Sequence, residues 1–322
     1  MSTEVEVRPS LAIPRTVRRR PPLVRRLFDD RVLLAFALPG TLLILLFHYV
    51  PLLGNVIAFK DYQPFLGILA SDWSGLENFA VIVTGDRQFL QALGNTLILT
   101  TLQSVFVFPA PILLALLMNS LFSERIKKIV QSILYLPHFL SWVIVVSLFQ
   151  QLLGGSGMLN NFLRSHDLGT VSIIGNPDVF HALLTSQIIW KDTGWATILF
   201  LAALSQIEPE LYEAASVDGA GRLRQLWHVT LPGLSGIIIL LFILRLGDSL
   251  SVGFEQILLQ QQAVGRGVSE VLDTYVYNNG VLGGDWGVSA AVGLVKGVVG
   301  VILVLAANRL AHVFGAEGVY RR

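Results

Sequence analysis

The sequence predicts an all-α integral membrane protein with six transmembrane helices. Composition is the first observation behind this prediction. The chain has 322 residues, of which 53% are hydrophobic and only 14% charged, whereas soluble globular domains carry about a quarter charged residues. The second observation is a series of apolar runs of about 20 residues, the length that a helix needs to cross a bilayer. The chain has no cysteine, which excludes disulfides and thiolate metal sites.

The apolar runs follow a basic segment, residues 1–31, which contains eight arginines and four prolines and which we expect to be a disordered cytoplasmic tail. The six predicted spans are residues 32–57, 93–117, 129–153, 180–204, 234–258 and 288–313. The fourth is interrupted by Lys191 and Asp192. Four prolines within the spans predict kinks, because neighbouring helices can satisfy the freed carbonyl groups: Pro39, Pro109, Pro111 and Pro137.

The distribution of Lys and Arg predicts the orientation of the chain. Basic residues gather in the N-terminal tail, between the second and third spans, before the fifth span and at the C-terminus. Cytoplasmic loops of membrane proteins carry an excess of Lys and Arg, so both termini are predicted to be cytoplasmic. The remaining segments are then an extracytoplasmic loop at 58–90, a membrane core at 91–314 and a cytoplasmic tail at 315–322.

Residues 207–232 form an unusually long connection between the fourth and fifth spans. Pro209 suits the first turn of a short helix, and glycines at 219 and 221 interrupt it. We expect a second short helix from Arg222 and the start of the fifth span at Pro232. The result would be a bent helix–turn–helix at the cytoplasmic surface that docks into a partner. An amphipathic turn that rests on lipid headgroups is the alternative.

The stretch EAASVDGAGRLRQLWHVTLP resembles the EAA loop of binding-protein-dependent ABC importer permeases. That pattern is Glu-Ala-Ala, three residues, Gly, nine residues, Ile, one residue and Leu-Pro; here Val229 replaces the usual Ile. In that family the loop is a coupling helix that docks in a groove of the ATPase subunit. The resemblance therefore implies ATPase coupling through Glu213, Ala214, Ala215, Asp218, Gly219, Leu231 and Pro232. Gly219 would permit a tight bend where a Cβ would clash with the turn or with the partner.

Further stretches, including YLPHFLSW and DTYVYNNG, resemble type I, MalF-like sugar permeases. The branch that handles complex oligosaccharides, including uronate-type ones, is the most similar. This resemblance implies a type I permease arrangement in the bacterial cell membrane, with an extracytoplasmic solute-binding protein as a partner. It also implies a second homologous permease, forming a heterodimer, two ATP-binding cassette ATPase subunits and a carbohydrate as the solute.

The chain itself shows no pattern for catalysis or for binding a cofactor, metal or nucleic acid. GLVKGVVG, at residues 293–300, is rich in glycine, but its lysine is misplaced for a P-loop and it lies within a predicted span. The histidines have no metal-ligand spacing. We therefore expect no enzymatic activity in this chain, with ATP hydrolysis on a partner subunit.

Ionisable and aromatic residues at membrane depth are candidates for the lining of a translocation path, because charges there are costly and usually face a cavity or a partner. These candidates are Trp190, Lys191, Arg245, Asp248, Glu255 and Lys296. Arg245 and Asp248 are three residues apart and could instead pair with each other.

Two other functions compete with the importer of oligosaccharides. The first is an ABC permease for another organic solute, such as a polyol or glycerol phosphate. The second is a stand-alone secondary transporter with Asp192, Asp248 or Lys296 as a proton relay.

Overall fold

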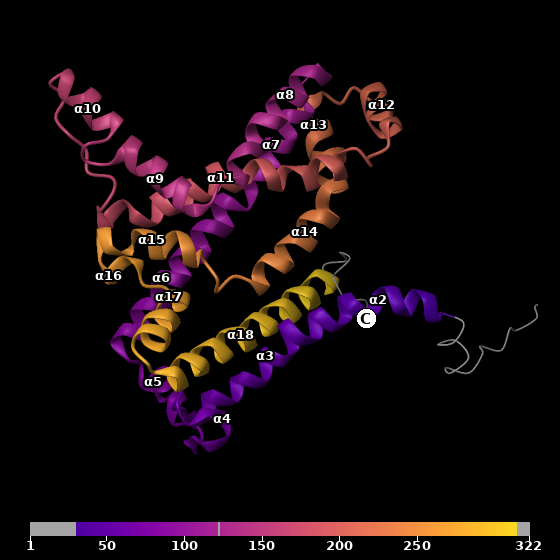
Figure 1. Cartoon of the computed structure of the whole chain (residues 1–322). Helices are drawn as coiled ribbons and strands as arrows, with labels where there is room; N and C mark the ends of the chain where they lie inside the picture. Colours follow the sequence, from indigo (N-terminus) through magenta and orange to yellow (C-terminus); the bar gives the residue numbers. More distant parts are fainter. Residues whose placement is uncertain (1–29, 122, 314–322) are drawn as a thin grey trace, which may run out of the picture. The chain divides into compact units, whose positions relative to one another are not determined.

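The computed structural model describes residues 30–121 and 123–313, which form helices almost throughout (Figure 1). The predicted basic tail at 1–31 lies outside these residues except for its last two, and the predicted tail at 315–322 lies outside them entirely. The chain divides into two units, residues 1–54 and 55–322, which are described separately.

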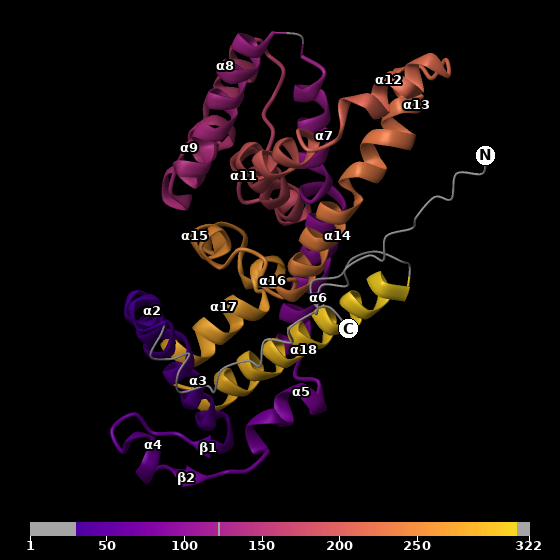
Figure 2. The same cartoon turned by 90° about the vertical axis from the view of Figure 1, so that its right-hand side faces the viewer.

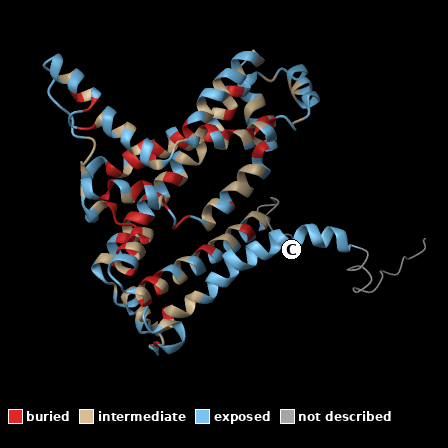
Figure 3. Ribbon diagram, viewed as in Figure 1, coloured by how far each residue is buried: buried red, intermediate tan, exposed pale blue. Residues whose placement is uncertain are grey.

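The first unit contains one helical run made of α2 (Arg31–Ile44), the π-helical η1 (Leu45–Tyr49) and α3 (Val50–Leu53). Pro39 lies inside α2. Every residue from Asp30 to Leu53 is exposed, so this run appears pale blue along its whole length in Figure 3. An apolar helix that is exposed on all sides is suited to a lipid or protein environment rather than water.

The second unit begins with a small region of short helices and strands, which includes most of the predicted loop at 58–90, and continues with the helices of the predicted core. The loop region contains η2 (Gly54–Phe59), β1 (Lys60–Asp61), α4 (Gly67–Ala70), β2 (Asp72–Trp73), η3 (Glu77–Phe79) and α5 (Ala80–Thr84). Its two strands pair antiparallel, with Lys60 opposite Trp73. The first part of the core contains α6 (Arg87–Leu102), η4 (Gln103–Val107), α7 (Pro109–Asn119), α8 (Glu124–Tyr135), η5 (Leu136–Phe139), α9 (Trp142–Leu153) and α10 (Met158–Ser165).

The second part of the core carries most of the candidate site residues. It contains η6 (Pro177–Val179), α11 (Phe180–Leu204), α12 (Pro209–Val217), α13 (Arg222–Gln225), η7 (Leu226–Thr230), α14 (Leu231–Gly247), α15 (Phe254–Val264), α16 (Arg266–Ser269), α17 (Leu272–Val276), η8 (Tyr277–Leu282) and α18 (Trp286–Val313).

Five helical segments of the described residues are long and apolar enough to cross a membrane: Arg31–Phe59, Arg87–Asn119, Trp142–Ser165, Arg222–Gly247 and Trp286–Val313. Helix α11 has the bounds predicted for the fourth span, 180–204. It is not among the five, because polar residues such as Gln187, Lys191 and Asp192 run through its middle. The polar part of α11 is largely buried in the protein.

The predicted third span, 129–153, was wrong as a single continuous helix. Helix α8 ends at Tyr135, the 3-10 turn η5 follows, and α9 begins only at Trp142. Pro137 lies in η5 and has no N–H to continue the helical hydrogen bonds. The Ser141 side chain then accepts a hydrogen bond from the Ile144 N–H (3.4 Å) and caps the new helix. The proline predicted as a kink is therefore part of a complete break.

The predicted fifth span, 234–258, was also wrong in its course. Its helix ends at Gly247, and α15 starts separately at Phe254. Between them Gly253 has a φ of +106°, a backbone conformation that interrupts a helix and that side chains other than glycine rarely adopt. Residues 248–253 therefore leave the helix and connect it to α15.

Helix α11 lies at the centre of the second unit, surrounded by α7, α8, α14 and α15 (Figure 2). At its crossing with α8, a Cβ on Gly194 would lie 1.9 Å from the Leu134 carbonyl oxygen. The two backbones can approach this closely only because Gly194 has no side chain. Gln187 joins α15 to α11, because its side-chain Oε1 accepts hydrogen bonds from the Nε2 atoms of Gln256 (2.7 Å) and Gln260 (3.0 Å).

Candidate coupling loop and translocation path

The candidate coupling loop forms a short helix, α12, that ends in a tight turn. Pro209 lies in its first turn, which confirms the prediction. At its end the Ala220 N–H donates to the Ala215 oxygen (2.8 Å) and the Gly219 N–H donates to the Ser216 oxygen (3.0 Å), the two bonds of a Schellman motif. Gly219 has a φ of +76°, and a Cβ there would meet nothing within 4 Å. Gly219 is thus needed for its backbone conformation, and the predicted clash with the turn itself is absent.

The expected second short helix does begin at Arg222, but it continues into the fifth span instead of ending before it. Segments α13, η7 and α14 form one continuous run from Arg222 to Gly247. Leu231 and Pro232 consequently lie inside this run rather than at its start. The π-helical turn η7 directly precedes them, which is how the helix accommodates Pro232.

Helix α12 is fastened to this span by side chains. The Tyr212 hydroxyl and the Thr230 Oγ1 are 3.1 Å apart in a hydrogen bond. Gln225 Nε2 donates to the Ser216 Oγ (2.8 Å) and to the Ala220 oxygen (3.1 Å). These bonds make α12 and the start of the span one compact piece, so a displacement of α12 would move the span.

The outer surface of this piece is exposed and partly apolar. Figure 1 shows α12 and α13 at an extremity of the second unit. Glu213 and Ala214 are exposed, and the neighbouring Val217 is 88% exposed. Leu223 on α13 is 69% exposed. An apolar patch with one acidic group is the kind of surface that a protein partner covers.

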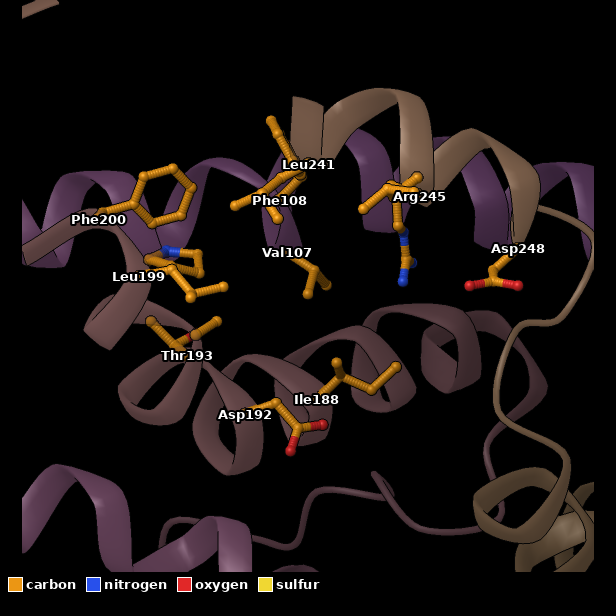
Figure 4. A pocket seen from close by; sticks show the side chains of 13 residues that line it. Val107, Phe108, Ile188, Asp192, Thr193, Leu199, Phe200, Leu241, Arg245 and Asp248 are labelled. Atoms are coloured by element: carbon orange, nitrogen blue, oxygen red, sulfur yellow. The ribbon is translucent and has the colours of Figure 1, made fainter. Parts of the chain in front are cut away.

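A cavity of about 330 Å³ lies between the η4–α7 segment, α11 and α14 (Figure 4). Most of its wall is apolar, but Asp192, Arg245 and Asp248 also line it. Arg245 projects from α14 toward α11 and donates a hydrogen bond to the Gln103 Oε1. The Thr193 Oγ1 is buried in the wall without a hydrogen-bond partner among the described residues. The cavity therefore offers polar groups to a polar solute.

The predicted pairing of Arg245 with Asp248 is absent as an ion pair, since the described residues contain no contact between them within 4.0 Å. Helix α14 ends at Gly247, and Asp248 has already left its helical face. Gln103, on η4, takes the place of Asp248 as the partner of Arg245. Gln103 is a polar residue inside the predicted second span, and this was the sequence signal that could have indicated its contact with Arg245.

Lys191 and Trp190 face other helices rather than this cavity. Lys191 is 6% exposed, and its Nζ donates to the His138 oxygen (2.6 Å) and lies 5.5 Å from the centre of the Trp142 ring. Trp190 packs edge-to-face on Phe149, with ring centres 5.8 Å apart. Both side chains thus join α11 to the broken third span, and the prediction that they line a path gains no support from their contacts.

His138 completes this cluster at the break between α8 and α9. Its Nδ1 is 2.9 Å from the Asp192 Oδ1, and its ring stacks on Trp195 with centres 4.8 Å apart. Sequence reasoning treated His138 as an isolated histidine, because its partners are more than 50 residues away. Asp192 therefore has two roles, since it holds the break and also lines the cavity.

The last two candidates lie beyond the end of α14. Glu255 is exposed in the first turn of α15. Lys296, on α18, forms an ion pair with Asp273 on α17. Asp273 lies outside every predicted span, so sequence reasoning missed it as a partner.

Residues 107–315 match the family described as binding-protein-dependent transport system inner membrane component. The chain belongs to this family. Two relatives from Bacillus subtilis support the assignment over nearly the whole permease. The polygalacturonan/rhamnogalacturonan transport system permease protein YteP is 48% identical over 303 residues, 94% of either chain. Protein LplB is 44% identical over 292 residues, 90% of this permease and 92% of LplB.

The permease is also similar to a chain in the crystal structure of a bacterial alginate ABC transporter in complex with an alginate pentasaccharide-bound periplasmic protein. The TM-score is 0.83 and the sequence identity 37%, over 92% of this permease and 99% of that chain. The type I permease fold, the multi-pass membrane location and the transport role predicted from the sequence are therefore confirmed.

Proposed function

We propose that this permease is one of two membrane subunits of an ATP-driven importer for an oligosaccharide. A second, homologous permease would complete the translocation path in a heterodimer, two ATPase subunits would bind on the cytoplasmic side, and an extracytoplasmic solute-binding protein would deliver the sugar. The observation that carries this proposal is the exposed helix α12, which is fastened to the span at Arg222–Gly247. Such a helix can transmit the closure of an ATPase into the membrane.

The relatives support a carbohydrate as the solute. Their names specify transport of polygalacturonan or rhamnogalacturonan and of arabinooligosaccharides, and one similar solved structure is an importer of the acidic polysaccharide alginate. The cavity of Figure 4 agrees with this class of solute, because Asp192, Thr193 and Arg245 in its wall can exchange hydrogen bonds with sugar hydroxyls.

Six spans with both termini in the cytoplasm remain part of the proposal. The sixth crossing would be α11, whose polar middle is buried against α7, α8 and α15. A helix with polar residues can cross a bilayer where other helices cover those residues. Basic residues before α2 and in the first turns of α8 favour the cytoplasmic side for the N-terminus and for the start of α8.

The variant Gly219→Asp tests the coupling role of α12. Its side chain would strain the backbone at a φ of +76° and would project from the exposed end of α12. We expect membrane insertion as in the wild type but loss of ATP-driven uptake and of ATPase co-purification. The control is Gly169→Asp, outside the apolar spans, where φ is also positive (+77°) and a Cβ also meets nothing within 4 Å. If Gly219→Asp retains wild-type uptake and co-purification, α12 is only a surface turn and the coupling proposal is wrong.

A further inference from the structure

One face of α18 carries Lys296 between two glycines. Gly293 and Gly297 are three residues before and one residue after Lys296, and all three residues border the same open space. A Cβ on either glycine would meet nothing within 4 Å. This stretch therefore borders open space with bare backbone and a single charged side chain.

The open space is a cavity of about 280 Å³ between the end of α14, α17 and α18. Its charged wall residues are Asp248, Asp273 and Lys296. Asp248 also lines the cavity of Figure 4, and Asp273 lines a further cavity of about 430 Å³ beside Phe254 and Tyr277. The cavity at Lys296 therefore shares Asp248 with one neighbouring cavity and Asp273 with the other.

Lys296 retains hydrogen-bonding capacity in this position. Its ammonium donates to the Asp273 Oδ1, and the two side chains are 18% and 23% exposed. An ammonium has three N–H donors, and Asp273 is its one hydrogen-bond partner among the described residues. Two donors of a largely buried cation are thus available on the side of the cavity.

We propose that Lys296 binds carboxylate groups of the solute, so that the permease selects a uronic-acid oligosaccharide over a neutral one of the same size. This inference rests on the proposed function and adds the charge of the solute to it. A carboxylate gains more from this ammonium than a hydroxyl does, because its hydrogen bond joins two opposite charges. The bare face at Gly293 and Gly297 leaves room for a sugar ring beside it.

Asp273 has a positioning role in this arrangement. It holds the ammonium at the cavity wall and neutralises it when no solute is bound. When a solute carboxylate arrives, Asp273 and Asp248, which both line this cavity, repel it and weaken its binding. Weak binding suits a path, because a solute that enters must also leave.

The test uses the complete complex in proteoliposomes with two matched sugars. The acidic probe is tri-galacturonic acid and the neutral probe is its full methyl ester, with uptake normalised to the amount of sugar-loaded binding protein. We expect Lys296→Met to raise the KM of the acid about tenfold or more, the effect of one lost charge-assisted hydrogen bond, and to affect the ester far less. Lys296→Arg should restore most uptake of the acid, and Asp273→Asn should lower its KM. Lys128→Met, at an exposed lysine on α8, is the control.

A purely structural ion pair gives a different pattern. Lys296→Met and Asp273→Asn would then lower uptake of the acid and of the ester alike and would destabilise the purified complex to a similar degree. That result overturns the carboxylate site but does not contradict the proposed importer function. A wild-type complex that prefers the ester would have the same consequence. A wild-type complex that imports neither these two sugars nor any other oligosaccharide tested with ATP would refute the proposed function itself.

Discussion

Single residues of this permease show how the same residue type takes opposite roles at membrane depth. Sequence reasoning treated Lys191 and Lys296 alike, as buried cations that line a path. The structure buries Lys191 against the His138 carbonyl oxygen and Trp142, whereas Lys296 borders a cavity. The difference depends on contacts between helices that are far apart in the chain, so composition and spacing could identify the two charges but not separate their roles.

Gly194 is the residue on which the crossing of α8 and α11 depends. We expect Gly194→Leu to destabilise the purified complex by about 1–3 kcal/mol or more, the usual cost of overpacking, because its Cβ alone would lie 1.9 Å from the Leu134 oxygen. The melting temperature of the detergent-purified complex measures this effect. The control is Gly236→Leu on α14, where a Cβ meets nothing within 4 Å. Equal melting temperatures for the two variants would mean that the two backbones are not in contact.

Whole helices were predicted with mixed success. The bounds of α11 and the first turn of α12 agree with the sequence, because length, Pro209 and the flanking glycines are local signals. The breaks within the third and fifth predicted spans were not recognised. A bilayer permits helix breaks only where protein or a cavity covers the freed backbone groups. That cover comes from other parts of the chain, such as α11 packing on η5, and is invisible in a hydropathy pattern.

Helix α12 carries an acidic residue that we expect to contact the ATPase. Glu213 is exposed on its surface, and we propose that it pairs with a basic residue of the ATPase, so Glu213→Lys should weaken the association by placing like charges together. We expect at least a severalfold loss of co-purified ATPase, with folding unchanged. A charge reversal of the opposing basic residue on the ATPase should restore part of it. Undiminished co-purification would show that Glu213 lies outside the contact with the ATPase. The control Lys128→Met, on α8, should leave the amount of co-purified ATPase unchanged.

For the molecule as a whole, composition predicted the membrane class, and the resemblance of the EAA loop and of further stretches to known permeases implied the family-level fold. The number of crossings depends on α11, whose polar middle keeps it from being recognised by apolarity alone. Reporter fusions after Gly75 and Gly284 should report an extracytoplasmic location and a fusion after Arg224 a cytoplasmic one. A cytoplasmic signal at Gly284 would contradict six spans and would place the two ends of α18 differently from the proposal.

We propose that this permease moves a sugar with energy that an ATPase partner transmits through α12. The most direct measurement is uptake of an oligosaccharide into proteoliposomes that contain the permease with and without its ATPase, second permease and binding protein. We predict uptake only when all partners and ATP are present, and its loss in Gly219→Asp at normal protein incorporation. Uptake by the permease alone, driven by a proton gradient and independent of ATP, would contradict the claim and would favour a secondary transporter.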